Sequence, residues 1–280
     1  MRKDKTSMTA RKVAANIVTL GQVPAMAGVL PAGLVETTAK LLVASGAVGV
    51  KAMRWVRSAG MVKVYRAFDP LLPGQFEAFG YRKAFCDRQV RGAIATGATQ
   101  VLVLGAGYDT LAWRLAPEFP DVDFFEVDHP PTARRKARGI AAMGQRGNLH
   151  LLAQDLAEKQ LTDVLNDTQE WDSRGQTVII AEGLVLYLPP DAVADLFRQC
   201  AAVAGPESRI AFSYIPMGAD GRPDAGKRTG LMLWLQKLTG EPWLSSIAPD
   251  ELGEFLGGTG WRLTDVSPKR GVEFYVVATR

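Results

Sequence analysis

The side chains of this sequence best suited to ligand binding are carboxylates and glycines that follow short apolar runs. Residues 101–104 are apolar and lead to Gly105 and Gly107, and a second run, 124–127, ends at Asp128 about twenty residues later. Such runs are typical of buried strands, and the glycines let the backbone turn sharply and a ligand approach closely. A carboxylate at the tip of the neighbouring strand can accept both hydroxyls of a ribose. The pattern predicts an adenosine-containing cofactor, with a purely structural turn between strand and helix as the alternative.

The residues after the two glycines favour one cofactor over another. A dinucleotide site seats a pyrophosphate on a helix N-terminus with a third glycine, but Thr110 occupies that position here. Asp109, which we expect to cap the following helix, would repel a pyrophosphate. S-adenosylmethionine has no phosphate and carries a cationic sulfonium and ammonium. The sequence therefore favours S-adenosylmethionine. An NAD-dependent oxidoreductase and a non-catalytic cofactor-binding regulator are the alternatives.

Two further apolar runs also end in acids. Residues 148–154 lead to Asp155, and residues 177–181 lead to Glu182. Parallel strands bind ligands at their carboxyl ends, so we expect these acids at one edge of a sheet. Asp155 could accept from the exocyclic amine of adenine or cap a helix before Ala157. Glu182 could touch the cofactor or be a buried acid that the following turn satisfies.

These motifs, in this order, resemble the leucine carboxyl methyltransferase family, which includes bacterial O-methyltransferases similar to polyketide carboxyl methyltransferases. The resemblance extends over roughly residues 75–215. The motifs that carry it are Tyr81-Arg82-Lys83-Ala84-Phe85, Gly105-Ala106-Gly107-Tyr108-Asp109-Thr110, Arg114-Leu115, Glu126-Val127-Asp128-His129-Pro130 and Ala181-Glu182-Gly183-Leu184-Val185-Leu186-Tyr187-Leu188.

The resemblance implies a cofactor site made of residues from each motif. Arg82 matches the family arginine that binds the methionine carboxylate of the donor, and Glu182 matches a position at the same end. Asp128 would hold the ribose. The expected cofactor-binding residues are Arg82, Gly105, Ala106, Gly107, Asp128, Asp155, Leu156 and Glu182.

The resemblance also implies an S-adenosylmethionine-dependent O-methyltransferase that acts on a carboxylate or hydroxyl of a small molecule. In-line methyl transfer needs alignment and exclusion of water rather than a covalent catalytic residue. A carboxylate acceptor is already ionised, whereas a phenol or alcohol would benefit from a base. His129, Glu182 and Tyr187 are the candidates for that base. Glu126, which shares a strand face with Asp128, could serve a structural partner instead.

The expected elements alternate as in an α/β protein. The fold class is a class I methyltransferase (Rossmann-like) fold with a seven-stranded, mostly parallel sheet and an antiparallel C-terminal hairpin, which ordinary dinucleotide domains lack. The three strands that complete it are expected at 209–214, 260–266 and 272–278. Helices are expected at 74–94, 130–142, 189–203 and 249–256.

The N-terminal part is basic. Residues 1–66 hold 11 Lys or Arg and 2 acids, although the whole chain has 33 and 29. Helices expected at 9–20, 34–45 and 48–58 would form a basic helical cap over residues 1–73, before a methyltransferase domain over 74–280. A solvated helical face is the first interpretation of the charge. An acidic acceptor or a transient contact with a membrane surface is the alternative.

A flexible stretch at 215–230 follows the fifth strand, and we expect it and the basic cap to cover the acceptor site. An ordinary surface loop is the alternative. The apolar residues 231–235 would pack on the core or line an apolar acceptor pocket.

Several classes of protein are disfavoured. Cys86 and Cys200 form no disulfide framework, and with His129 and His150 as the only histidines no metal site is expected. The longest apolar run, 41–50, is short of the ~20 residues of a membrane span. No apolar signal segment follows the charged start, so we expect a cytoplasmic protein without stable membrane insertion. Aromatic residues do not alternate with the cations as in nucleic-acid modules, so the expected partner is a small-molecule acceptor.

Overall fold

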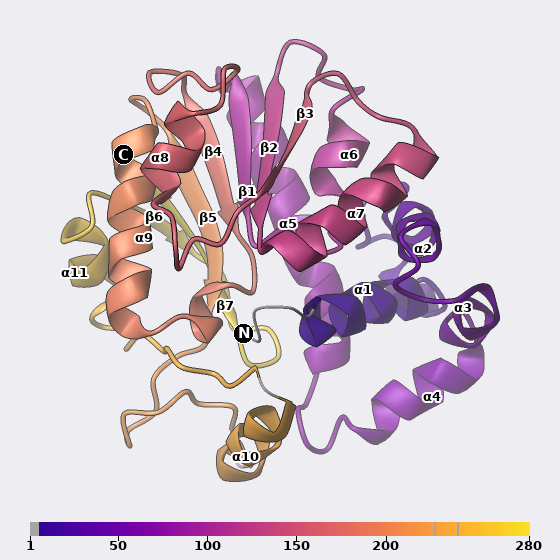
Figure 1. Ribbon diagram of the computed structural model, residues 1–280. Coiled ribbons are helices and arrows are strands. Elements are labelled where there is room, and N and C mark those ends of the chain that lie inside the picture. Colours follow the sequence, from indigo (N-terminus) through magenta and orange to yellow (C-terminus); the bar gives the residue numbers. More distant parts are fainter. Residues whose placement is uncertain (1–5, 227, 240) are drawn as a thin grey trace.

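A seven-stranded sheet forms the centre of the protein, for which a computed structural model describes residues 6–226, 228–239 and 241–280 (Figure 1). The strand order is β3-β2-β1-β4-β5-β7-β6. Strands β1 to β5 pair in parallel, and β7 runs antiparallel to both β5 and β6. The strands are β1 Gln100–Leu104, β2 Asp123–Asp128, β3 Leu149–Ala153, β4 Thr177–Ala181, β5 Arg209–Tyr214, β6 Arg262–Val266 and β7 Phe274–Thr279. The predicted fold class is therefore confirmed.

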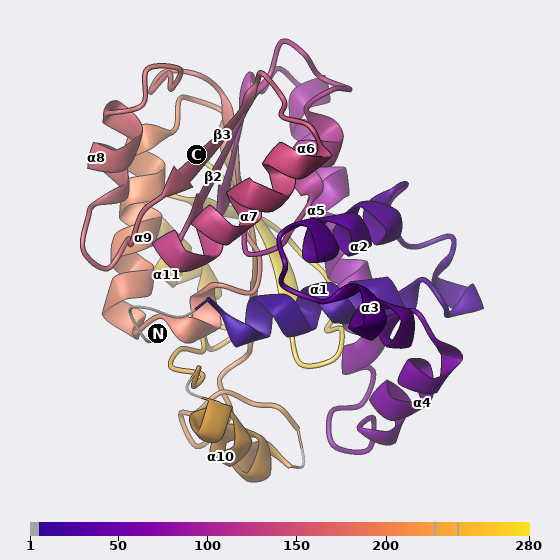
Figure 2. The same ribbon diagram turned by 45° about the vertical axis from the view of Figure 1, so that its right-hand side comes forward.

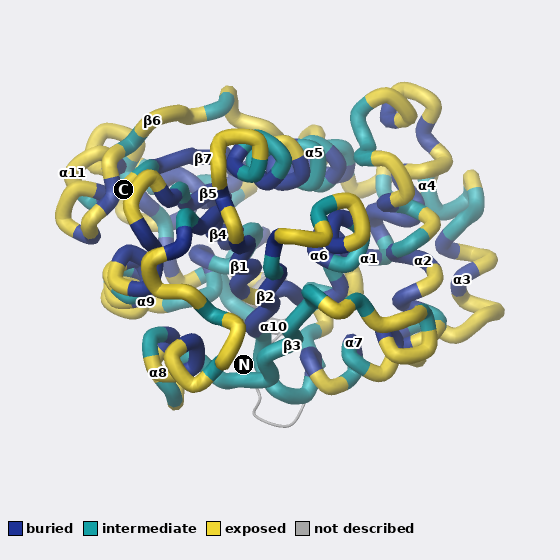
Figure 3. Tube along the Cα trace, turned by 90° about the horizontal axis from the view of Figure 1, so that it is seen from above, coloured by how far each residue is buried: buried dark blue, intermediate teal, exposed yellow. Residues whose placement is uncertain are grey.

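Helices cover both faces of the sheet because the strands are apolar on both sides. Val101 and Val103 pack with α5 Gln75–Ala95 and α6 Leu111–Leu115 on one face, where α7 Pro130–Met143 also lies. Leu102 and Leu104 pack with α8 Leu161–Asn166, α9 Pro190–Val203 and α11 Leu252–Gly257 on the other. This alternation follows from the two-residue period of a strand and gives the sandwich seen along the sheet in Figure 3.

The N-terminal helices lie beside the sheet, and the first of them crosses the edge where the parallel strands end (Figures 1 and 2). They are α1 Met8–Leu20, α2 Leu34–Ala44, α3 Val50–Val56 and α4 Ala59–Ala67, with a 3-10 turn, η1, over Pro24–Met26. The predictions for α1 and α2 are confirmed. The helix expected at 48–58 is the shorter α3, and α4 was not predicted. All residues of α4 are described and none is buried; its apolar residues alternate with cations and do not mark a core-facing side in the sequence.

Helices α1 and α2 pack tightly on the rest of the protein. An added Cβ at Gly139 of α7 would lie 2.8 Å from Leu41 Cδ1 and 3.0 Å from the Ser45 nitrogen, so glycine lets α2 lie directly on α7. One apolar cluster contains α1 and α2 residues together with Tyr108 and Ile140. The predicted division at residue 73 stays a prediction.

The remaining elements differ slightly from expectation. β6 and β7 begin two residues later than predicted. For β7 the reason is that Arg270 and Glu273 pair across the preceding turn and leave Glu273 just before the strand. A short 3-10 turn, η2 Val185–Tyr187, follows β4, and α10 spans Thr229–Thr239. Cys86 and Cys200 are buried and free. Among the described helices, none has the length and apolar composition that crossing a bilayer requires.

Candidate functional site

The glycine turn after β1 has the backbone that its sequence requires. Gly105 has φ 63° and Gly107 φ 51°, both in the left-handed region that favours glycine. The Gly105 N–H donates to the Val127 carbonyl over 2.9 Å and extends the pairing of β1 with β2. An added Cβ would lie 3.1 Å from Leu184 at Gly105 and 3.0 Å from the Ala10 Cβ at Gly107. The segment after β4 and helix α1 therefore cover the turn from two sides.

Asp128 ends β2 beside this turn. Its Oδ2 accepts the Gly107 N–H over 2.7 Å, and its Oδ1 accepts the His129 N–H over 2.7 Å. Burial raises the pKa of Asp128 above its usual value, although both hydrogen bonds act in the opposite direction. Each carboxylate oxygen keeps a further lone pair. Asp128 can therefore accept two hydroxyls from a ribose while remaining fixed by the backbone.

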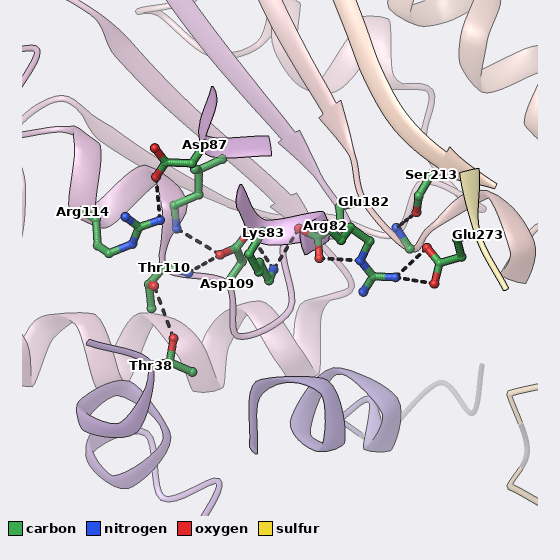
Figure 4. A network of polar contacts seen from close by, with 12 residues as sticks. Thr38, Arg82, Lys83, Asp87, Asp109, Thr110, Arg114, Glu182, Ser213 and Glu273 are labelled. Carbon is green, nitrogen blue, oxygen red and sulfur yellow. Dashed lines mark hydrogen bonds and ion pairs between the residues drawn. The ribbon is translucent and has the colours of Figure 1, made fainter. Parts of the chain in front are cut away.

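A buried network of charges lies at the carboxyl end of β4 (Figure 4). Arg82 of α5 donates from Nε to Glu182 over 2.9 Å and from Nη1 to both oxygens of Glu273 over 2.7 and 2.8 Å. Burial by itself lowers the pKa of Arg82, and the charges of Glu273 and Glu182 outweigh it and raise the pKa. An added Cβ at Gly183 would lie 3.1 Å from the guanidinium, so this position needs glycine both for contact and for its φ of 60°.

Lys83, the next residue of α5, joins this network to the glycine turn. Its Nζ lies 2.8 Å from Glu182 Oε2 and 3.1 Å from Asp109 Oδ2. Asp109 Oδ1 also accepts the N–H groups of Thr110 and Leu111. The N-cap residue of α6 is Thr110 and not Asp109 as predicted, so Asp109 fixes the turn just before the helix. Burial alone would raise the pKa of Asp109, but neighbouring cations led by Lys83 lower it to about 2. The network thus pairs two cations with three carboxylates and leaves one formal negative charge.

His129 and Asp155 meet at the ends of β2 and β3. His129 Nε2 lies 3.4 Å from Asp155 Oδ2, and His129 Nδ1 is buried without a hydrogen-bond partner among the described residues. Asp155 Oδ1 accepts the Ala157 N–H over 3.0 Å and fixes a turn. The helix that Asp155 would have capped is absent from the described residues, since α8 begins at Leu161. One carboxylate oxygen of Asp155 therefore faces His129 while the other fixes the turn. Leu156, half-buried, packs against the main apolar cluster.

Tyr187 and Glu126 are the remaining residues that the sequence singled out. Burial raises the pKa of Tyr187 in η2 to about 12, with the Thr9 hydroxyl as a hydrogen-bonding neighbour. A tyrosine with that pKa keeps its proton at neutral pH. Glu126 lies 2.5 Å from Nζ of Lys136 in α7, and both side chains are buried. Glu126 therefore has the structural partner that we considered for it.

Sequence reasoning assigned no role to three of these residues: Lys83, Lys136 and Glu273. Glu273 reaches Arg82 across 191 residues of chain, and only the placement of β7 beside β5 brings the two together. The signal in the sequence was a single acid between apolar Val272 and Phe274, at the start of an otherwise apolar strand.

A groove lies next to the long loop after β5. Its volume is about 440 Å³, and its walls include Met217, Leu233, Trp234, Trp243 and Leu244. The Leu244 N–H donates to the Leu186 carbonyl of η2 over 2.7 Å, so one wall of the groove is joined to the segment after β4. The loop and α10 thus border an apolar space beside η2.

The sheet order, the antiparallel β7 and the acids at the strand ends define a class I methyltransferase fold. A solved candidate O-methyltransferase from Nostoc punctiforme has this fold at a TM-score of 0.51, with 12% identity over 72% of this chain and 59% of that one. The mitomycin 7-O-methyltransferase structure covers 96% of this chain and 94% of its own at 15% identity and a TM-score of 0.49.

The family model of the leucine carboxyl methyltransferases matches residues 36–201, and the chain belongs to that family. Proteins named as candidate S-adenosyl-L-methionine-dependent methyltransferases are similar to it. One from Mycobacterium ulcerans is 32% identical over 66% of this chain and 60% of its own length. One from Mycobacterium bovis is 29% identical over 67% of this chain and 56% of its own. The chain therefore matches less than two thirds of the length of these relatives.

Proposed function

We propose that the protein is an S-adenosylmethionine-dependent O-methyltransferase that methylates a carboxylate or hydroxyl of a small molecule. The observation that carries the proposal is the negative formal charge of the buried network of Arg82, Lys83, Asp109, Glu182 and Glu273. The donor has two cationic groups and one carboxylate, so its net charge is complementary to the network. A pyrophosphate cofactor would place two further negative charges at the same edge, which disfavours NAD. Family membership supports the same choice.

Each part of the donor has a residue suited to it. Asp128 would accept the ribose hydroxyls, and Asp155 with Leu156 would lie at the adenine. Gly105, Ala106 and Gly107 would shape the space for the methionine end, together with Glu182 and Arg82. The contact with Arg82 requires the donor carboxylate to share the guanidinium with Glu273.

When bound, the donor supplies a sulfonium methyl group for in-line attack by the acceptor oxygen and leaves as a neutral thioether. The residues of this chain then have to align the reactants and exclude water. Leu184 and Ala10 cover the glycine turn and can exclude water there. A carboxylate acceptor needs no base. For a hydroxyl acceptor, the pKa of about 12 argues against Tyr187, and Glu182 is engaged by Arg82 and Lys83. His129 lies against Asp155 at the proposed adenine end, so none of the three candidates is well placed to act as that base.

The groove bounded by Trp234, Trp243 and the loop after β5 is our candidate for the acceptor side. The N-terminal cap would close it, because the Ser7 hydroxyl and the Thr9 N–H both bond Glu241 over 3.0 Å. This arrangement supports the expectation that the cap and the 215–230 loop cover the acceptor. A cytoplasmic location is also part of the proposal, since both buried cysteines are free.

Calorimetry tests the proposal. The protein should bind S-adenosylhomocysteine in the micromolar range and show no heat with NAD; the reverse result would refute it. Asp128→Asn should weaken S-adenosylhomocysteine on the order of ten- to hundredfold, because one charge-assisted hydrogen bond is lost. Asp123→Asn, at the other end of β2, is the matched control and should bind normally.

The pH dependence follows from the same carboxylate. Because the pKa of Asp128 is raised, acid pH should protonate it and weaken S-adenosylhomocysteine binding, and Asp128→Asn should lose that dependence. A donor-consumption assay over a panel of carboxylic and phenolic acceptors separates an enzyme from a cofactor-binding regulator. Turnover with any member supports the proposal, and binding without turnover throughout the panel supports the regulator.

A further inference from the structure

Helices α3 and α4 carry an exposed apolar stripe that the site does not use. Of the nine large apolar side chains that are exposed among the described residues, four lie between residues 50 and 68. They are Val50 at 61%, Trp55 at 55%, Val64 at 38% and Phe68 at 62% exposure. Figures 1 and 2 place both helices at the margin of the molecule, opposite α9 and α11. Figure 3 shows exposed stretches along both.

The stripe is continuous because of one close contact. An added Cβ at Gly60 would lie 3.1 and 3.2 Å from ring atoms of Trp55, so the indole of α3 lies against the first turn of α4. Gly60, Val64 and Phe68 follow one another at intervals of four, which places them on one side of that helix. The row from residue 60 to residue 68 measures about 12 Å at the helical rise. Trp55 therefore begins a row that Val64 and Phe68 continue.

The side of α4 next to this row anchors the helix to the protein. The Tyr65 ring stacks on Phe76 of α5, with centroids 4.8 Å apart. Tyr65, Met61 and Val62 are half-buried, whereas Lys63, Val64 and Phe68 are exposed. The helix thus presents its outer face in a fixed orientation.

Cations flank the stripe without neighbouring acids. Lys51, Arg54, Lys63 and Arg66 are all exposed. No Asp or Glu occurs from residue 37 to residue 68. The nearest acids along the chain are engaged: Glu36 pairs with Arg57 over 2.8 Å, and Asp69 accepts the Gly74 N–H over 2.8 Å. An apolar stripe with an indole, bordered by unopposed cations, has the composition of a helix that lies in a lipid interface.

We propose that α3 and α4 dock the protein on the surface of an anionic lipid bilayer, with Trp55, Val64 and Phe68 in the interface and Lys51, Arg54, Lys63 and Arg66 facing the headgroups. Charge complementarity selects this occupant. A second copy on a two-fold axis would bring the same cations against one another, which is unfavourable. A nucleic acid would satisfy the cations but leave Val64 and Val50 without an apolar partner. Docking in the interface requires no membrane-spanning helix.

Co-sedimentation of the full chain with vesicles tests the proposal. It should bind phosphatidylcholine vesicles that contain phosphatidylglycerol, bind less as salt increases, and not bind pure phosphatidylcholine. Trp55→Ala/Phe68→Ala and Lys63→Glu/Arg66→Glu should each weaken binding at least about tenfold, because each removes one of the two contributions. Thermal unfolding should be unchanged, since all four side chains are exposed.

Matched variants elsewhere control for composition. Leu231→Ala/Trp234→Ala removes equally exposed apolar residues from α10, and Arg174→Glu/Arg198→Glu makes the same charge change on the α9 side. Both should bind vesicles like the wild type. Brominated lipid should quench tryptophan fluorescence in the wild type but much less in Trp55→Phe.

Four results would overturn the proposal: no binding to anionic vesicles, equal binding to neutral ones, equal loss in the control variants, or unchanged binding in the α3–α4 variants. Two further measurements distinguish the other occupants. If vesicles are not bound and light scattering shows a dimer that Trp55→Ala/Phe68→Ala dissociates, the surface belongs to a second copy. If vesicles are not bound and the protein is retained on DNA or RNA at physiological salt, the surface belongs to a nucleic acid.

Discussion

Arg82 shows how a residue matched by family resemblance acquires further partners in the fold. The sequence predicts a cation for the donor carboxylate, and the structure surrounds that cation with Glu182 and Glu273. A guanidinium presents five donors in a rigid fork, so it can hold more than one carboxylate. Removing it outright would leave the buried Glu273 without a cationic partner, at a cost of about 3–5 kcal/mol, whereas Glu182 would keep Lys83. A test of Arg82 must therefore keep its charge.

Arg82→Lys keeps the charge but loses the fork. S-adenosylhomocysteine should bind at least about tenfold more weakly, because lysine lacks Nη2, the guanidinium nitrogen that Glu182 and Glu273 do not engage. 5′-Methylthioadenosine, which lacks the amino-acid end, should bind with unchanged affinity, as calorimetry can show. The matched control is Arg91→Lys on the same helix, where the guanidinium makes two bonds to Glu118. Equal weakening of both ligands would reduce Arg82 to a structural role.

The residues that the sequence identified are those whose role is local. Gly105 and Asp109 follow a strand directly, and Asp128 ends one, so their positions at the sheet edge follow from the order of apolar runs. Glu273 and Lys136 could not be assigned because their partners depend on which strands and helices become neighbours. An acid in an apolar strand reveals that a partner exists but not where it lies.

At the scale of elements, α1 is the part of the cap that meets the proposed donor site. Ala10 lies against Gly107, and the helix start is tied to Glu241 by Ser7 and Thr9. A carboxylate at a helix N-terminus is favourable because the backbone N–H groups there lack partners. These two hydrogen bonds to Glu241 are a small contact compared with the packing of α1 on α2. We therefore expect that the first turn of α1 can open while the rest of the helix remains in place.

Glu241→Gln should make donor exchange faster. The amide keeps the shape but loses the charge and one acceptor, which weakens the contact by about 1 kcal/mol. Stopped-flow measurements with S-adenosylhomocysteine should show association and dissociation both accelerated severalfold, with little change in affinity. Glu254→Gln on the exposed side of α11 should leave both rates unchanged. Wild-type rates in Glu241→Gln would show that the first turn of α1 does not control access.

The bounds of helices and strands were predicted best from the sequence where the element buries much apolar surface. The runs at 101–104 and 177–181 lie inside strands buried on both faces, and the sequence predicted them to within a residue. Helix α4 was missed because its exposed stripe contains Val64 and Phe68 together with cations, so its apolar residues do not mark a core-facing side. The start of β7 was misplaced because pairing across a turn is not visible in composition.

At the scale of the whole molecule, the question is whether the predicted cap, 1–73, and the methyltransferase domain, 74–280, unfold together. Their apolar surfaces are shared: Leu41 and Leu42 belong to one cluster with Tyr108 and Ile140, and Leu20 belongs to another with Phe76. Two parts that bury each other's side chains lose most of their stabilisation when they separate. We therefore expect one cooperative transition.

Leu41→Ala tests this expectation from within the cap. Leu41 is 1% exposed and faces Gly139 of α7, so its truncation should cost about 2–5 kcal/mol and lower the melting temperature on the order of 5 to 15 °C. Circular dichroism and tryptophan fluorescence should report the same shifted midpoint, and saturating S-adenosylhomocysteine should raise it. Leu231→Ala, at 48% exposure, should melt like the wild type. Two separate transitions, of which Leu41→Ala shifts only one, would instead show that the chain divides into units that unfold independently.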